Sequence, residues 1–241
     1  MLPSLLLLIA CGGSEPAEPA PVPEPQVATP PAAKDLHAHM EEHFAALSSA
    51  RNAVVAGDLE AARERLGWLA THEPTEELPA AWTVFVSAMR AAAKRSSEAE
   101  GAEALARGVA HVASECGSCH ESMGKGPLFT EQPSAAEGNT TRDHMIRHNE
   151  ASEQMWQGLI GGDDARWLAG ANALSDTEPL RELKHPTDKG IPEVSRALGV
   201  KVHELGLEGL GTMDRVARAN LYGELIGTCA LCHAVENVPP G

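Results

Sequence analysis

The sequence predicts an all-α protein made of two tandem up-down-up-down four-helix bundles. Two observations lead to this fold class. The 241-residue chain has one tyrosine and three phenylalanines, and a core with few aromatic and β-branched residues is more easily packed from helices than from sheet. The second observation is an internal repeat, each copy of which contains four predicted helices.

The repeat appears when the chain is slid along itself. At an offset of 105 residues, His39-Met40 falls on His144-Met145, His43 on His148 and Gly57-Asp58 on Gly162-Asp163. From Pro79 and Pro192 onward the offset is 113, so the second copy is eight residues longer. The extra residues are expected in the loop from 180 to 191.

Each copy predicts four helices with recognisable ends. Gly57 ends the first helix, Asp58 caps the second, and Pro74 follows the end of the second. The predicted helices of the first copy cover residues 35–56, 58–72, 80–97 and 99–122, and those of the second cover 141–161, 163–176, 192–207 and 211–234. Short connections make successive helices antiparallel neighbours. The start of each copy's first helix should therefore lie beside the end of its fourth.

The first 34 residues predict an export signal followed by a tether. Residues 1–10 are an apolar run too short to span a bilayer, which takes roughly 20 apolar residues, so they are interpreted as a cleaved targeting segment. The sequence Leu-Ile-Ala-Cys resembles a bacterial lipoprotein signal, which implies that Cys11 is the lipidated first residue of the mature chain. An ordinary signal with an incidental cysteine is the alternative. Residues 11–34 are rich in Pro, Ala and Glu and predict an extended tether.

The charge of the chain restricts its partners. The sequence has 19 basic and 34 acidic residues, a net charge of −15 spread along the chain. Nucleic acid is excluded as a partner, because binding it needs a basic face that displaces counterions. The charge suits a redox partner with a basic docking face, and equally an acidic surface that binds nothing in particular. The oligomeric state stays open.

Two identical cysteine patterns account for every cysteine after Cys11. They read Cys116-Gly117-Ser118-Cys119-His120 and Cys229-Ala230-Leu231-Cys232-His233. Two thiols one helical turn apart can each add to a vinyl group of a haem, and the adjacent histidine then reaches the iron from the same side. The sequence therefore predicts two haem c groups, attached through Cys116, Cys119, Cys229 and Cys232, with His120 and His233 as the proximal iron ligands.

Three other uses of these cysteines are weaker. The pairs are 113 residues apart, and a structural zinc site would not require a histidine directly after each pair. A thioredoxin-like redox pair needs a βαβ context that the sequence lacks. A disulfide within Cys-x-x-Cys closes too short a loop to stabilise the fold much.

The opposite side of each iron is expected near the start of a first helix. A stripe from Leu36 to Val54 has the spacing of the inward face of a bundle helix. It includes Met40 and His43, which correspond to Met145 and His148 in the second copy, whereas His39 and His144 are expected beside it. The candidates for the distal ligand, one per haem, are therefore Met40 or His43 and Met145 or His148. An iron without a distal protein ligand is the third alternative.

A four-helix unit with Cys-x-x-Cys-His near the end of its last helix resembles cytochrome c′ and its low-spin class II relatives. The resemblance covers most of residues 35–125 and 140–235. It implies a methionine as sixth ligand on the first helix, about as far before the first loop glycine as Met40 lies before Gly57. The chain departs from the family just after His120, where Met123 and Lys125 stand in place of an aromatic and a basic residue.

These observations predict five segments: a cleaved signal (1–10), a lipidated cysteine with its tether (11–34), a first haem-binding domain (35–125), a linker (126–139) and a second haem-binding domain (140–241). The expected function is electron transfer without catalytic residues, at the periplasmic face of a bacterial membrane. The alternative is binding or sensing of nitric oxide or carbon monoxide at an open distal site. A peroxidase-type enzyme is the third hypothesis. Such enzymes need an acid–base group above an open iron, and His43 and His148 are the candidates for it. Two units in one chain suggest electron transfer between the haems.

Overall fold

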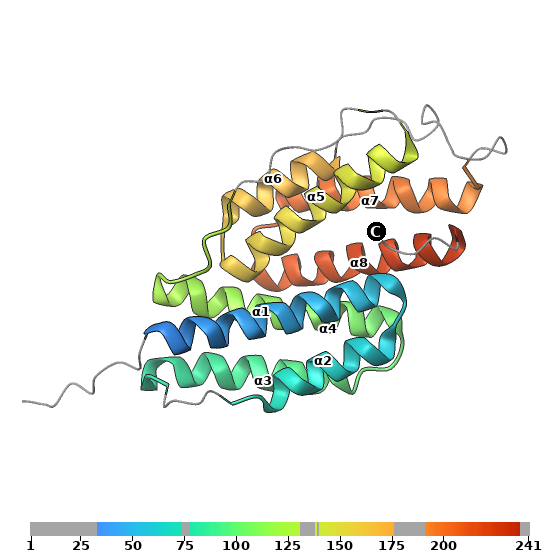
Figure 1. The fold of residues 1–241 in the computed structure, drawn as a ribbon. Helices are drawn as coiled ribbons and strands as arrows, with labels where there is room; N and C mark the ends of the chain where they lie inside the picture. The colour runs from blue at the N-terminus through green and yellow to red at the C-terminus, as the bar shows by residue number, and fades with distance from the viewer. Residues whose placement is uncertain (1–32, 74–77, 131–137, 139, 176–190, 237–241) are drawn as a thin grey trace, which may run out of the picture. The chain divides into compact units, whose positions relative to one another are not determined.

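The structure is a computed structural model that describes residues 33–73, 78–130, 138, 140–175 and 191–236. The all-α prediction is confirmed: the described helices pack sequentially, as in two four-helix bundles (Figure 1). They lie in one compact unit of the chain. The predicted signal, Cys11 with its predicted lipid, and nearly all of the predicted tether and of the 180–191 insertion lie outside the described residues.

The first half contains four helices and a short 3-10 turn. They are α1 (Ala33–Ala56), α2 (Leu59–Thr71), η1 (Ala80–Trp82), α3 (Thr83–Ser97) and α4 (Ala102–Met123). Gly57 ends α1 with a φ of 77°, a left-handed conformation that glycine adopts without strain. The Asp58 side chain then accepts a hydrogen bond from the Ala61 amide at 3.0 Å and caps α2.

The second half repeats this arrangement. Its helices are α5 (Thr141–Gly161), α6 (Asp164–Ser175), α7 (Glu193–Gly211) and α8 (Arg215–Glu236). Thr140 and Asp143 form a capping box at the start of α5, and Gly162 ends it with a φ of 68°. The predicted boundary between the last two helices was wrong by four residues. Helix α8 begins later because Asp214, not Gly211, precedes it and accepts a hydrogen bond from the Ala217 amide at 2.8 Å.

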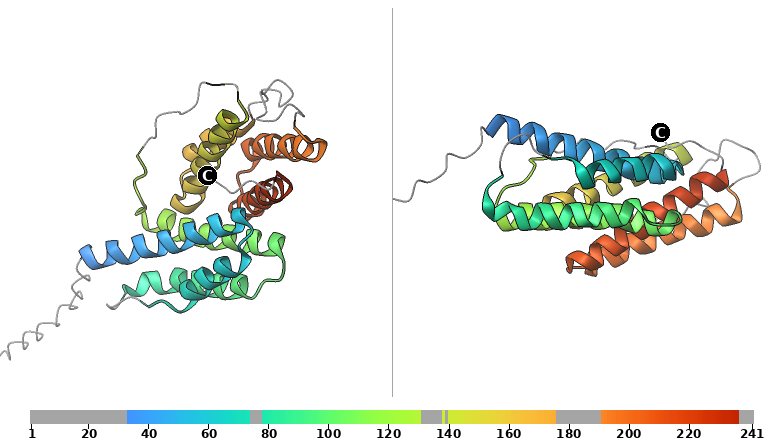
Figure 2. Two further views of the ribbon diagram at one scale, coloured as in Figure 1. Left: turned by 45° about the vertical axis from the view of Figure 1, so that its right-hand side comes forward. Right: turned by 90° about the horizontal axis from the view of Figure 1, so that it is seen from below.

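The two halves meet along α4 and α8, the helices that carry the cysteine motifs. These helices are antiparallel: Glu121 near the end of α4 pairs with Arg215 at the start of α8, and His111 Nε2 lies 2.9 Å from Asn220 Oδ1. The backbones approach so closely that a Cβ on Gly223 would lie 2.6 Å from the Arg107 Cα. Figures 1 and 2 show α8 beside α4 from three directions.

A buried tryptophan fills the junction of the halves. The Trp156 side chain on α5 is fully buried, and its indole donates a hydrogen bond to Ser48 Oγ on α1 at 3.3 Å. Its ring stacks on Tyr222 of α8, with centroids 5.5 Å apart, and the Arg51 guanidinium lies 5.0 Å from the ring centroid. Trp156 therefore links helices of both halves. Among the described helices, none is long and apolar enough to cross a membrane.

Candidate haem-attachment sites and histidine clusters

The first Cys-x-x-Cys-His motif occupies the last turns of α4. The helix ends at Gly124, whose φ is 58°, and the Lys125 amide donates to the His120 carbonyl at 3.0 Å. Cys116 and Cys119 are both free thiols. A pair of unbonded thiols about one turn apart, with a histidine directly after them, is the donor set that covalent haem attachment requires.

The His120 ring is held by the other half of the molecule. Its Nδ1 lies 2.8 Å from the Ile160 carbonyl oxygen in the last turn of α5. A ring that donates from Nδ1 presents an unprotonated Nε2, and metal-ligating histidines are commonly oriented in this way. Burial lowers the pKa of His120, which keeps the ring in the neutral form that binds metals. The surroundings of His120 therefore fit an iron ligand.

The second motif occupies the last turns of α8, where Cys229 and Cys232 are also free thiols. Burial lowers the pKa of His233, but its buried Nδ1 has no hydrogen-bond partner in the described part of the chain. The two halves thus differ here, because the carbonyl that orients His120 comes from the junction between α4 and α5. A side-chain hydrogen bond from Ser195 to Glu236 joins the start of α7 to the end of α8.

The structure argues against the other uses of the cysteines. Burial raises the pKa of both Cys116 and Cys229 to about 12, whereas reactive redox pairs depend on a lowered thiol pKa. A Cβ on Gly117 would lie 2.5 Å from Arg215 Nη1, so the first motif lies beside the start of α8. Cys229 follows Arg215 by fourteen residues, or about 20 Å of helix at about 1.5 Å per residue. The four cysteines therefore cannot share one zinc ion.

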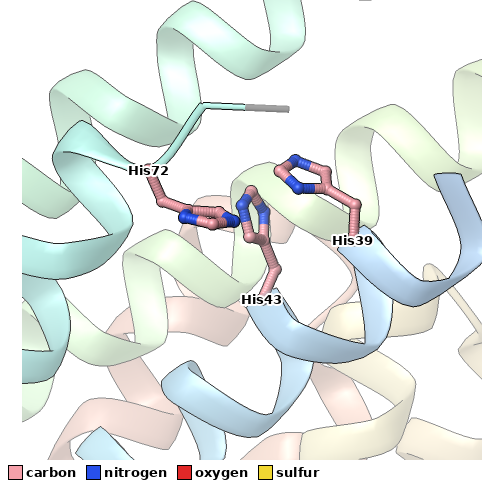
Figure 3. A group of neighbouring side chains, drawn as sticks. All are labelled: His39, His43 and His72. Carbon is pink, nitrogen blue, oxygen red and sulfur yellow. The ribbon is translucent and has the colours of Figure 1, made fainter. Parts of the chain in front are cut away.

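Three histidines meet near the start of α1. His39 and His43 lie one turn apart on α1, and His72 is the C-cap residue of α2. Each offers a ring nitrogen within 4.8 Å of those of the other two, and Figure 3 shows the three side chains converging. The ring centroids of His39 and His43 are 4.2 Å apart. We call this group the first histidine cluster.

This cluster and the first cysteine motif lie at the same end of the first half. Figure 1 shows α1 beginning where α4 ends. Phe129, just after α4, packs on Phe44, the residue that follows His43, with ring centroids 5.8 Å apart. The up-down-up-down topology thus brings the start of the first helix to the end of the fourth, as the sequence predicted.

The second half contains an equivalent group, the second histidine cluster. His144 and His148 lie on α5, and His203 lies on α7. Their ring nitrogens are also within 4.8 Å of one another. His203 Nδ1 lies 2.7 Å from the Leu174 carbonyl oxygen at the end of α6.

The structure corrects the expected orientation of the first helices. His39 is 8% exposed and His144 2% exposed, whereas Met40 and Met145, expected on the inward stripe, are half-buried. The buried face runs from His39 through His43 to Leu47 at intervals of four residues, a regular helical spacing. The predicted stripe is confirmed from His43 through Leu47 and Ala50 to Val54 and is wrong only at its N-terminal end, where His39 rather than Met40 is buried.

Two histidines were missed as members of a site. They are His72 and His203, neither of which was identified from the sequence as a candidate ligand. The topology offered a signal for His72, because the end of the second helix returns to the end of the bundle where the first begins. No such signal existed for His203, which aligns with Arg90 in the repeat.

One histidine on the first helix of each half, His43 and His148, has a strongly lowered pKa and is neutral at ordinary pH. Burial, followed by the nearby His39 and His72, lowers the pKa of His43 to about 3. Burial and the rings of His144 and His203 hold the pKa of His148 well below its ordinary value. Neutral imidazole is the form that ligates metals, since its free nitrogen carries a lone pair.

The lowered pKa of His43 predicts acid destabilisation. Protonation is favoured in the unfolded chain, where the pKa is near 6.5, so stability is full above about 6.5 and falls as the pH drops toward about 3. Each pH unit in this window removes up to about 1.4 kcal/mol of unfolding free energy. Urea unfolding between pH values of about 6.5 and about 4 should show a shallower loss for His43→Leu than for the unmodified protein. The exposed His37→Leu is the matched control, and equal slopes for both variants would contradict the prediction.

The chain was also compared with known proteins. No protein-family model matches it, and no curated protein and no solved structure does so either.

Proposed function

We propose that this protein is a dihaem c-type cytochrome that transfers electrons in the bacterial cell envelope, anchored by a lipid on Cys11 at the periplasmic face of a membrane. One observation carries the proposal. Each four-helix half ends in a Cys-x-x-Cys-His motif with free thiols, on the final turns of its last helix. The thiol pair and the histidine form a complete haem c attachment set in both halves.

The chain's own residues have distinct roles in this proposal. Cys116 and Cys119 hold the first haem, and Cys229 and Cys232 hold the second. His120 and His233 supply the proximal nitrogens, and the Ile160 carbonyl orients the His120 ring at 2.8 Å. The bound haem iron supplies reversible one-electron chemistry. Buried apolar side chains such as Leu47 and Val109 exclude water from the interior, and the hydrophobicity around a haem is one of the means by which a protein sets its potential.

The candidate distal iron ligands are the same residues that the sequence predicts. They are Met40 or His43 in the first half and Met145 or His148 in the second. His43 is the more buried of the first pair, while the family resemblance favours the methionines. A methionine would give a higher potential than a second histidine.

The antiparallel pairing of α4 and α8 supports a path through the molecule. The two attachment motifs are about 20 Å apart along the helix axis and lie at opposite ends of the central helix pair. Electrons would then enter at one end and leave at the other, and the net charge of −15 would favour partners with basic docking faces.

Mass and absorption spectra of the exported protein test the proposal. We expect a denatured mass with two covalently bound haems and a c-type spectrum on reduction. If the sixth ligands are protein side chains, carbon monoxide should leave the reduced spectrum unchanged. A rapid shift with carbon monoxide would instead favour the gas-binding function. A mass without haem would overturn the proposal altogether.

A further inference from the structure

The histidine clusters contain more ligands than a haem can use. The proximal nitrogen comes from His120 or His233, so a haem needs at most one further protein ligand. Each cluster nevertheless brings three imidazoles together, with their nitrogens within 4.8 Å of one another. Three histidine ligands are the set found in one common class of zinc site, with water at the fourth position.

The spacing of the nitrogens is close to that of a metal site. Nitrogens about 2.0 Å from one tetrahedral zinc ion lie about 3.3 Å apart, so the rings would need to close by at most about 1.5 Å from their separation of up to 4.8 Å. Two of the three ligands in each half lie one turn apart on one helix face (His39 and His43, His144 and His148), the spacing that helical zinc sites use.

The unused hydrogen-bonding capacity of the rings points to a ligand. The Nε2 atoms of His43, His148 and His203 are buried and have no hydrogen-bond partner in the described part of the chain. A buried polar atom left without a partner is costly, and one metal ion in each cluster would satisfy these atoms.

Other groups orient the third ligand of each cluster. His203 Nδ1 is bonded to the Leu174 carbonyl at 2.7 Å, which leaves Nε2 for the ion. His72 Nε2 lies 3.3 Å from a carboxylate oxygen of Glu42, which leaves Nδ1. A carbonyl or carboxylate bonded to the second ring nitrogen is a common feature of metal-ligating histidines.

The repeat explains two histidines in each cluster but not the third. His39 and His43 correspond to His144 and His148, whereas His203 corresponds to Arg90 and His72 has no histidine counterpart in the second copy. In the first half, Arg90 instead holds the chain at the cluster, because it donates to the His72 carbonyl and lies 3.2 Å from a carboxylate oxygen of Glu73. The same three-histidine arrangement is thus reached from non-equivalent helices.

We propose that each half holds a divalent transition-metal ion of the zinc class, bound by His39, His43 and His72 in one half and by His144, His148 and His203 in the other. The ions are separate from the haem irons, and the inference rests on the clusters alone. With His43 and His148 engaged by these ions, the distal position of each haem falls to Met40 and Met145 or stays open.

Metal analysis of the full-length, haem-loaded protein tests this proposal with Zn²⁺ as the probe. We expect two zinc ions per chain in addition to the iron. His72→Ala and His203→Ala should each lose one, with affinity at that site reduced at least about 100-fold, because even an outer partner of a ligand is worth about 10–100-fold. His37→Ala and His111→Ala are matched controls and should retain both ions, since His37 is exposed beside Glu41 and His111 is bonded to Asn220.

A second measurement uses the unmodified protein, so its result does not depend on whether the variants fold. Co²⁺ added to the zinc-free protein should give the visible absorption of a tetrahedral nitrogen site, and equimolar Zn²⁺ should remove it. The proposal is overturned if the unmodified protein binds neither ion, or if both variants retain two zinc ions. It is also overturned if zinc is absent and His43→Ala changes the haem spectrum, because the cluster would then supply the distal haem ligand. The haem count, obtained from the denatured mass, reports on the proposed electron-transfer function independently.

Discussion

Replacing Cys116 and Cys119 together with alanine is expected to reduce the covalent haem content from two per chain to one. Without the two thioether bonds, a haem in the first half would be held through His120 alone and would be released on denaturation. Denatured mass spectrometry should therefore show a single haem, and the reduced spectrum should be that of the second site.

The chain offers matched controls for this experiment. Cys229→Ala with Cys232→Ala should remove the other haem and leave the first spectrum, so the sum of the two variant spectra should reproduce that of the unmodified protein. Ser118→Ala lies between the first pair of cysteines, where the native hydroxyl donates to the Ser114 carbonyl at 3.0 Å in its own helix, and should retain both haems. Two covalent haems in the double-cysteine variant would contradict the assignment of this motif.

Trp156→Ala is expected to destabilise the fold by about 3–5 kcal/mol. The side chain is fully buried, and its removal would leave a cavity between Ser48, Arg51 and Tyr222, on helices of both halves. Chemical denaturation, with haem occupancy matched between samples, measures the free energy of unfolding.

Trp82→Ala is the control for this substitution. Trp82 is half-buried at the end of η1, away from the junction, so its truncation should cost clearly less. A loss in Trp156→Ala no greater than that in Trp82→Ala would mean that the junction contributes little to stability.

Local rules explain why most of the fold could be predicted from the sequence. Gly57 and Gly162 end the first helices because the chain adopts a positive φ at both, and Asp58 begins the next helix because its side chain caps the Ala61 amide. These interactions span only a few residues, so they can be recognised in sequence. The one sizeable boundary error, at the start of α8, came from overlooking the cap at Asp214.

The candidate site was predictable only in part. The cysteines and adjacent histidines of the motifs lie together in sequence, and that spacing is what predicts haem attachment. His39 and Met40 are adjacent at the start of α1, and either could continue the stripe that begins at His43; the structure buries His39 and leaves Met40 half-buried. His39 stacks on His72 at the end of α2, a contact between separate helices that no periodicity along the chain reports.

The sequence by itself determined the helices, their order, the duplication and the four cysteines with their two histidines, because each depends on neighbours along the chain. Only the tertiary structure decided that His72 and His203 complete the histidine clusters. It also decided that α4 and α8 run antiparallel and separate the two motifs, and that Trp156 joins the halves. These features depend on contacts between residues far apart in the chain, which form only when whole helix faces pack together.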